Sequence, residues 1–230
     1  MGNNKLIQLK DSLVGALSKH GSVEEIALFG SLVKGDVDQY SDIDMIVAIS
    51  SPINGLEALG HFGEVRYYRS FSSVKFPSGR YWMKGYSVFN KIDISFHTLD
   101  EFEKIVLHGD PEGYTTPPFN IEWKANRVTS AKSISTNIDM ASPYIFSEAE
   151  DKIGKLVYRL SRSLKSVYRN ESPEHDPHDV YSELSSLWAI HSNSKWVGGA
   201  LDSLVTEILS LGSESDTVVL HNVTPLNKYE

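Results

Sequence analysis

Residues 28–47 read Leu-Phe-Gly-Ser-Leu-Val-Lys-Gly-Asp-Val-Asp-Gln-Tyr-Ser-Asp-Ile-Asp-Met-Ile-Val. The apolar segments 23–29 and 43–49, which flank the polar middle of this stretch, predict two strands. The connection between them begins with Gly30-Ser31, and glycine permits the sharp turn that the chain needs on leaving a strand. We therefore expect a turn and an irregular connection between two core strands of one sheet.

Asp42 and Asp44 lie at the start of the second predicted strand. Side chains two positions apart on a strand project from the same face, so these carboxylates are expected to be close neighbours. Two neighbouring anions repel each other unless a cation bridges them, and oxygen-only ligation suits Mg²⁺ or Mn²⁺. The spacing predicts a metal site that uses both acids.

The Gly30-Ser31 turn is a candidate phosphate site, because backbone N–H groups near a glycine can approach a phosphate and the serine hydroxyl adds a donor. A phosphate cradle beside a metal site favours attack on a metal-bound phosphorus. Such chemistry also uses a third carboxylate on the acceptor side. Asp93 is the best candidate, because it is an acid in an otherwise apolar strand, where an unpaired charge is costly to bury.

These features together resemble the DNA polymerase β-like nucleotidyltransferase superfamily over roughly residues 20–100. The resemblance implies that Gly30 and Ser31 hold the nucleotide phosphates. It also implies that Asp42 and Asp44 bind both metals, and that Asp93 binds one metal and activates the acceptor hydroxyl.

Two further residues enter through this resemblance. Lys34 occupies a place where a basic residue is common in the family, which favours a phosphate contact, although a surface lysine is the alternative. Asp100 is the fallback for Asp93, but its place in a capping-box pattern favours a helix start.

The remaining pattern predicts an α+β fold, with a mixed, mostly antiparallel sheet, flanking helices and a C-terminal α-helical bundle. Capping and turn signals mark the element ends. In the first part of the chain we expect a helix at 5–20, antiparallel hairpins within 64–98 with turns at 77–79 and 90–91, and a helix at 99–107. In the second part we expect helices that begin after Ser147 and at Asp176-Pro177, a last helix at 197–211, and a mobile tail after Ser213. We expect a nucleotidyltransferase domain at 1–112 and a helical accessory, acceptor-binding domain at 113–230.

Composition narrows the function classes. The 230 residues are 40% hydrophobic, which is enough for a packed core, and the lack of cysteine excludes disulfides, thiolate metal sites and a cysteine nucleophile. A formal net charge of -8 argues against a long nucleic acid as the partner. No apolar run is long enough to cross a bilayer and no secretory h-region is present, so we expect a cytoplasmic protein without a membrane role.

Other constellations are explained more simply. The acids within 36–44 could suggest a calcium-binding loop. In a register that begins at Asp36, however, Ser41 and Val47 stand where that loop has a glycine and a glutamate. His175, His178 and His191 could suggest zinc, but Asp176-Pro177 between the first two is typical of a helix start. Aromatic residues in the strands are expected in the core. The candidates to hold a cationic acceptor are Glu101, Glu103, Asp110 and Glu122.

The leading functional hypothesis is transfer of a nucleoside monophosphate, most simply AMP from ATP, to a hydroxyl of a small acceptor with pyrophosphate leaving. An aminoglycoside-like antibiotic would suit the acidic chain, and the helical part resembles the accessory bundle of aminoglycoside and lincosamide nucleotidyltransferases. The alternatives are a protein or RNA acceptor, or a non-catalytic interaction module. An RNA acceptor would need a basic stripe, and the predicted helix after Ser147 offers only a partial one, in Lys152, Lys155, Arg159, Arg162, Lys165 and Arg169.

Overall fold

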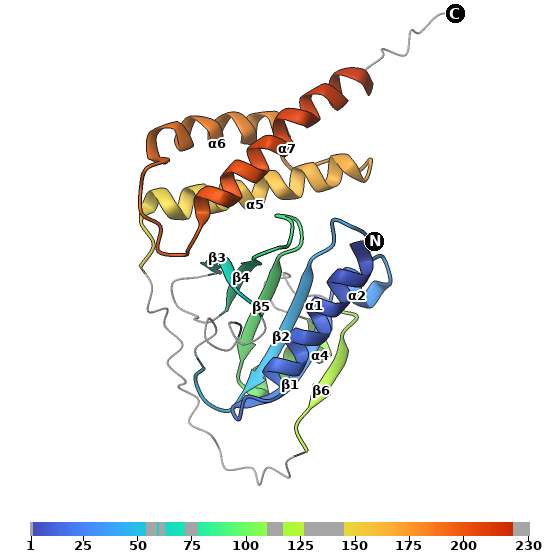
Figure 1. The fold of residues 1–230 in the computed structure, drawn as a ribbon. Coiled ribbons are helices and arrows are strands. Elements are labelled where there is room, and N and C mark those ends of the chain that lie inside the picture. Colours follow the sequence, from blue (N-terminus) through green and yellow to red (C-terminus); the bar gives the residue numbers. More distant parts are fainter. Residues whose placement is uncertain are drawn as a thin grey trace, which may run out of the picture. The chain divides into compact units, whose positions relative to one another are not determined.

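The computed structural model describes residues 2–53, 59, 63–71, 78–109, 117–126 and 145–222. Contacts between Cα atoms divide the chain into two compact units, Met1–Ile145 and Phe146–Glu230. The first unit contains the sheet and the second is helical, as Figure 1 shows. No helix among the described residues is both long and apolar enough to cross a membrane.

The described sheet of the first unit has six strands in the order β3-β4-β5-β2-β1-β6. The strands are β1 (Val23–Phe29), β2 (Ile43–Ile49), β3 (Val65–Ser70), β4 (Gly79–Met83), β5 (Ile92–His97) and β6 (Asn120–Lys124). β2 and β5 pair in parallel, and the other neighbours pair antiparallel. The expected α+β fold with a mixed, mostly antiparallel sheet is therefore confirmed.

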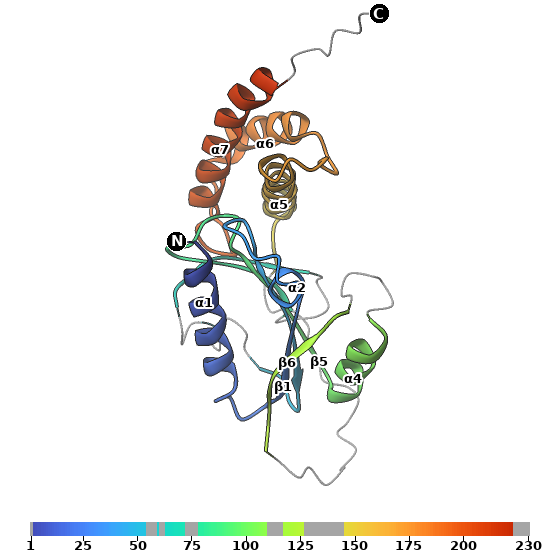
Figure 2. The same cartoon turned by 90° about the vertical axis from the view of Figure 1, so that its right-hand side faces the viewer.

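Helices α1 (Gly2–Leu17) and α4 (Leu99–His108) cover opposite faces of this sheet, as Figure 2 shows. α1 buries a stripe of leucines at helical spacing: Leu6, Leu9, Leu13 and Leu17. On the other face, Phe102 and Ile105 of α4 pack with Ala27, Ile46 and Ala48 of the two central strands. The sheet is therefore buried on both sides at β1 and β2, which explains why these strands are almost continuously apolar.

The start of α4 follows the expected capping box. The Thr98 hydroxyl accepts from the Glu101 backbone N–H at 3.4 Å, and the Glu101 carboxylate accepts from the Thr98 N–H at 3.2 Å. Two N–H groups at the helix start are thereby satisfied by local side chains. The helix begins where the sequence predicts because this signal needs no tertiary partner.

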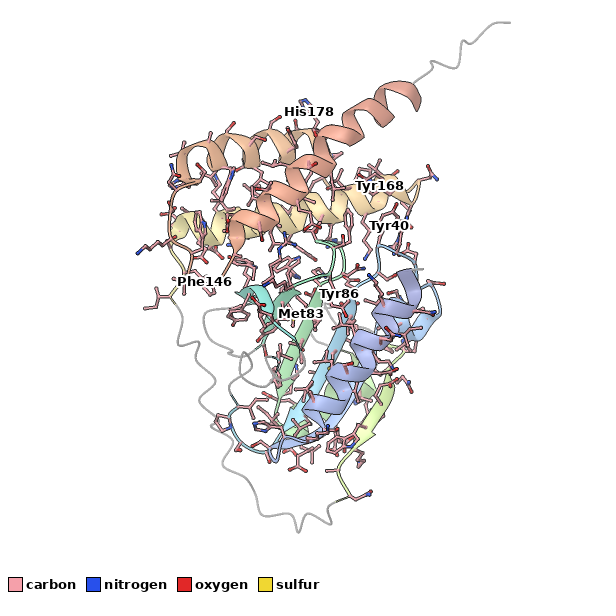
Figure 3. All side chains as sticks on the ribbon, viewed as in Figure 1. Tyr40, Met83, Tyr86, Phe146, Tyr168 and His178 are labelled. Carbon is pink, nitrogen blue, oxygen red and sulfur yellow. The ribbon has the colours of Figure 1, made fainter. Side chains whose placement is uncertain are left out.

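The second unit contains α5 (Glu148–Tyr168), α6 (Pro177–His191) and α7 (Leu201–Asn222), with α5 packed against the other two. Asp176 caps α6 by accepting from the His178 N–H at 2.8 Å, as its Asp-Pro start predicts. The Tyr168 hydroxyl, labelled in Figure 3, donates to the Leu211 carbonyl at 3.4 Å within this unit. α7 begins later than expected and continues to Asn222, so residues 214–222, expected to form a tail, are helical.

The buried side chain of Glu150 lies at the start of α5 and contacts the loop before α7. Ser147 caps α5 as predicted, accepting from the Glu150 N–H at 3.1 Å. The Glu150 carboxylate accepts from the backbone N–H groups of Val197 at 3.0 Å and Gly198 at 2.7 Å. A buried acid thereby holds the loop before α7 against the start of α5.

Two elements were not expected from the sequence. Gly30–Tyr40, expected to be turn and irregular connection throughout, contains a single helical turn, α2 (Ser31–Lys34). β6 lies after the expected boundary at 112/113 and nevertheless pairs with β1, and the first compact unit extends to Ile145. β6 is a short edge strand with exposed or half-buried residues, so it lacks the apolar alternation that reveals a strand.

Candidate active site

The register of the sheet places polar residues of three strands in one row. Asp44 on β2 pairs directly with Asp93 on β5, and Phe29 at the end of β1 pairs with Asp44. Asp93 in turn pairs with Arg80 on β4. Directly opposed residues of neighbouring strands share a face, so Asp44, Asp93 and Arg80 project from the same side of the sheet.

Three carboxylates meet at this row. Asp42 precedes Asp44 by two positions, and one oxygen from each of Asp42, Asp44 and Asp93 lies within 4.8 Å of the other two. All three residues are partly buried. Asp100, the fallback, lies in the first turn of α4, beyond the opposite end of β5 from Asp93. The structure brings together the three acids that the sequence singled out, which we call the aspartate triad.

Gly30 allows the turn after β1 to lie against the triad. Its backbone has φ 72° and ψ -149°, a conformation that essentially only glycine adopts. A Cβ atom at this position would lie 2.3 Å from Oδ2 of Asp44. The glycine is therefore required both by the backbone angle and by the carboxylate that occupies the space of a side chain.

Ser31 and Lys34 begin and end α2. The Ser31 hydroxyl oxygen is buried and has no hydrogen-bond partner among the described residues. A buried hydroxyl without a partner is destabilising, so such groups in native proteins often await a ligand or water. Lys34 is exposed in the single turn of this helix.

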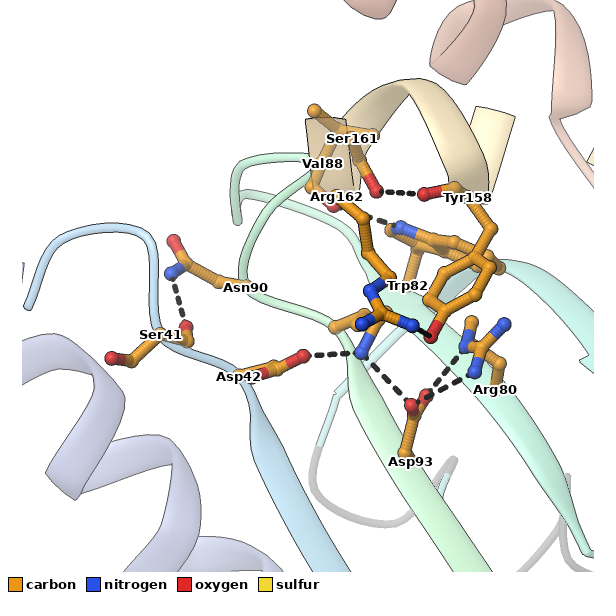
Figure 4. A network of polar contacts seen from close by, with 11 residues as sticks. Ser41, Asp42, Arg80, Trp82, Val88, Asn90, Asp93, Tyr158, Ser161 and Arg162 are labelled. Carbon is orange, nitrogen blue, oxygen red and sulfur yellow. Dashed lines mark hydrogen bonds and ion pairs between the residues drawn. The ribbon is translucent and has the colours of Figure 1, made fainter. Parts of the chain in front are cut away.

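Two buried cations complete the site, and the sequence analysis missed both. Arg80 donates through Nε to Oδ1 of Asp93 at 2.7 Å and through Nη2 to Oδ2 at 3.0 Å. The Lys91 ammonium donates to Oδ2 of Asp93 at 2.9 Å and also to Oδ2 of Asp42. The dashed lines between Asp42, Asp93 and Arg80 in Figure 4 mark these contacts.

The cations and the acids keep one another ionised. Burial by itself lowers the pKa of Lys91, but the carboxylates of Asp42 and Asp93 outweigh it and hold this pKa above its ordinary value of 10.5. Burial by itself raises the pKa of Asp93, but the charges of Arg80 and Lys91 outweigh it and hold this pKa below its ordinary value of 3.8. Asp93 is therefore a carboxylate and Lys91 an ammonium at neutral pH.

One of these cations carried a sequence signal. Lys91 lies two residues before Asp93, and the strand period of two places both on one face. A lysine beside an acid in an apolar strand predicts a buried pair. Arg80 carried no comparable signal, because its place opposite Asp93 depends on the register between β4 and β5.

The loop that leads into Asp42 is held by local hydrogen bonds. Oδ1 of Asp38 accepts from the Tyr40 N–H at 3.0 Å and the Ser41 hydroxyl at 2.9 Å. Asn90 donates to the Ser41 carbonyl at 2.8 Å, and the Tyr40 ring, labelled in Figure 3, meets Phe89 edge-on at 5.4 Å between centroids. These contacts give Asp38 a structural role and fix the path of the chain into the triad.

The other acids that the sequence proposed lie in several environments. Glu101 belongs to the capping box of α4, and Glu122 on β6 accepts from Lys10 of α1 at 3.1 Å. Glu103 is exposed on α4, and Asp110 lies outside the described residues. His175 and His178 lie at the start of α6 and His191 at its end.

Comparison with known proteins identifies a family match for one part of the chain. Residues 10–75 match the family model described as a nucleotidyltransferase domain. No curated protein matches the chain. The matched segment includes the turn at Gly30-Ser31 and the first two acids of the triad, Asp42 and Asp44, while Asp93 joins them through the parallel pairing of β2 and β5. This match supports a relationship of residues 10–75 to the DNA polymerase β-like nucleotidyltransferase superfamily.

Proposed function

We propose that this protein transfers a nucleoside monophosphate, most simply AMP from ATP, to a hydroxyl of a small molecule, with pyrophosphate as the leaving group. The observation that carries the proposal is the aspartate triad, with carboxylate oxygens within 4.8 Å of one another beside the Gly30-Ser31 turn. The match of residues 10–75 to a nucleotidyltransferase domain supports the reaction class.

The donor set suits Mg²⁺ or Mn²⁺, because both prefer oxygen ligands and leave positions for substrate phosphates. The triad offers carboxylate oxygens only. Such an ion would supply positive charge that stabilises the α-phosphate and the departing pyrophosphate. In this proposal Asp42, Asp44 and Asp93 hold the metal.

The Gly30-Ser31 turn would hold the triphosphate. The absent side chain of Gly30 keeps the backbone close to the triad, and the buried Ser31 hydroxyl supplies a donor that lacks a partner among the described residues. Lys34, exposed at the end of the same helical turn, would add positive charge on the phosphate side.

Asp93 would orient the acceptor hydroxyl. Its pKa is held below 3.8 by Arg80 and Lys91, despite the opposing effect of burial. A carboxylate whose pKa is lowered in this way accepts a proton less readily while these cations remain beside it. The role of Asp93 in this proposal is to hold the metal and to position the acceptor hydroxyl.

The acceptor class is inferred from charge. A net charge of -8 favours a cationic small molecule such as an aminoglycoside-like antibiotic. Of the acids proposed to hold it, Glu103 is exposed, whereas Glu101 and Glu122 already have protein partners. We propose that the helical residues after the sheet unit form the acceptor-binding part.

The ion pairs of α5 disfavour RNA as the acceptor. Lys152 pairs with Glu183 at 3.0 Å, and Lys155 pairs with Asp151 at 2.6 Å. Arg162 of the same helix lies 3.4 Å from Glu174. Three of the six basic residues that suggested a stripe are therefore offset by acids, which weakens attraction to a phosphate backbone.

Calorimetric titration tests this proposal. ATP and its α,β-methylene analogue are titrated with Mg²⁺ into the wild type, the double variant Asp42→Asn/Asp44→Asn, and the control Asp36→Asn, whose side chain is exposed in the same connection. Pyrophosphate release is then followed across a panel of hydroxyl-bearing acceptors. We expect metal-dependent binding in the wild type and the control, loss of binding in the double variant, and release with one acceptor.

The other outcomes separate the alternatives. Binding without release from any small acceptor would favour a protein acceptor. Absence of metal-dependent nucleotide binding in the wild type would overturn the enzymatic proposal in favour of an interaction module with the same fold.

A further inference from the structure

Lys91 contacts two acids that are distant from each other in the sequence. Its ammonium donates to Asp42, just before β2, and to Asp93 on β5. Its side chain is 5% exposed, so the contact is shielded from solvent. An ion that bridges these two carboxylates would need the space that the ammonium occupies.

The charges at the site are nearly balanced by the protein itself. The three carboxylates of the triad carry three negative charges, and Arg80 and Lys91 carry two positive ones. A divalent ion added to this set would leave a net positive cluster in a partly buried place. Repulsion from Arg80 and Lys91 therefore weakens the attraction of the ion to the triad, and Lys91 also occupies part of its position.

The two cations are held differently. The fork of Arg80 donates to both oxygens of Asp93, which is the geometry of a fixed pair. The Lys91 ammonium is a compact charge on a flexible stem, and it is shared between two acids. Lys91 is therefore the cation that can be exchanged.

We propose that Lys91 is an internal counter-cation that occupies the metal position of the aspartate triad and leaves Asp42 when a divalent ion binds. This proposal rests on the proposed nucleotidyl transfer. A nucleoside triphosphate brings the negative charge that favours the exchange, so the metal ion binds weakly alone and more tightly with the nucleotide. Lys91 acts as a positioning residue that couples the two binding events.

Binding of Mn²⁺ without nucleotide tests this exchange. The free ion is measured by electron paramagnetic resonance in the presence of wild type, Lys91→Gln or Lys84→Gln. Lys84 is the matched control, because it forms an exposed pair with Glu64 in the same unit, with a side chain 67% exposed. Loss of one buried positive charge should tighten Mn²⁺ binding by at least about tenfold in Lys91→Gln. Lys84→Gln should bind as the wild type does.

Coupling to the nucleotide gives a second readout that a purely structural lysine would not change. The gain in Mn²⁺ affinity on adding α,β-methylene ATP should be larger for the wild type than for Lys91→Gln. Unchanged or weaker Mn²⁺ binding by a folded Lys91→Gln, or an equal gain in both proteins, would overturn the proposal.

Failure to fold in chelator would itself be informative. If Lys91→Gln loses its far-UV circular dichroism in EDTA, Mn²⁺ should restore the spectrum, because the ion replaces the missing counter-cation. No recovery would overturn the exchange. If the wild type binds Mn²⁺ and ATP while Lys91→Gln shows no difference, only the exchange fails. If no protein binds Mn²⁺ with or without ATP, the proposed function fails with it.

Discussion

Glu150 in the helical unit and Asp93 in the sheet unit are both carboxylates that lie largely inside the protein, but different groups satisfy them. Glu150 is 0% exposed and accepts from two backbone N–H groups, those of Val197 and Gly198. Asp93 is held by the side chains of Arg80 and Lys91 and lies beside two further acids. One site is built from neutral donors of the main chain and the other from charged side chains.

The two sites differ in role, because the contacts of Glu150 support the fold and those of Asp93 belong to the candidate active site. A backbone N–H cannot leave its carboxylate without moving the chain, so Glu150 fixes the loop before α7 in place. A side-chain cation can move without moving the main chain, so the proposed exchange of Lys91 is compatible with an intact fold. We expect substitutions at the first site to change stability and substitutions at the second to change binding and turnover.

The largest effect is expected at the proposed metal site. Asp44→Asn should lower pyrophosphate release at least about a thousandfold, equivalent to about 4 kcal/mol, because a metal ligand is lost. Its free energy of unfolding should be equal to or above the wild-type value, because removal of one of three neighbouring acids relieves repulsion. Release assays and urea unfolding check this. A loss of stability large enough to explain the lost activity would contradict the expectation that substitutions at this site change binding and turnover rather than stability.

Glu150→Ala should lower the free energy of unfolding by about 3 kcal/mol, because two buried backbone N–H groups lose their acceptor. Mn²⁺ binding should remain as in the wild type. Glu148→Ala, an exposed position one residue into α5, is the control and should leave stability almost unchanged. Urea unfolding followed by circular dichroism checks both. Equal stability of the two variants would show that the Glu150 contacts contribute little.

Gly30→Ala tests how the turn and the triad depend on each other. The variant should be less stable by about 2 kcal/mol, because alanine is strained at this backbone angle and its Cβ would clash with Asp44. Metal-dependent ATP binding should weaken as the carboxylate is displaced. Gly15→Ala, where an added Cβ meets nothing within 4 Å, is the control and should not lose stability. Thermal unfolding and calorimetry measure the two effects, and normal ATP binding by the strained variant would count against the turn as a phosphate site.

The smallest effect is expected for Ser31→Ala. ATP affinity should fall about tenfold, because one hydrogen bond to a charged phosphate is lost. Stability should be unchanged or slightly higher, because the buried hydroxyl has no partner among the described residues. Ser203→Ala, which removes a hydroxyl that donates to the Ala200 carbonyl, is the control for ATP binding. A drop in stability without a change in affinity would assign Ser31 a structural role.

Local signals allowed the sequence to predict the elements that position the site. The strands at 23–29 and 43–49 and the helix after Thr98 follow from apolar runs and a capping box, which depend on neighbouring residues alone. β6 was missed because an edge strand is half exposed and carries little apolar pattern. The contacts of Glu150 with the backbone N–H groups of Val197 and Gly198 could not be predicted, because these residues are distant from Glu150 in the sequence.

The sequence by itself determined that Asp42 and Asp44 share a face next to a glycine turn, because the period of a strand and the freedom of glycine are local properties. Only the tertiary structure decided that Asp93 stands opposite Asp44, that Arg80 clamps it and that Lys91 bridges it to Asp42. These relations depend on the parallel register of β2 and β5 and on the neighbouring β4. Strand register arises from packing of the whole sheet, which no single segment encodes.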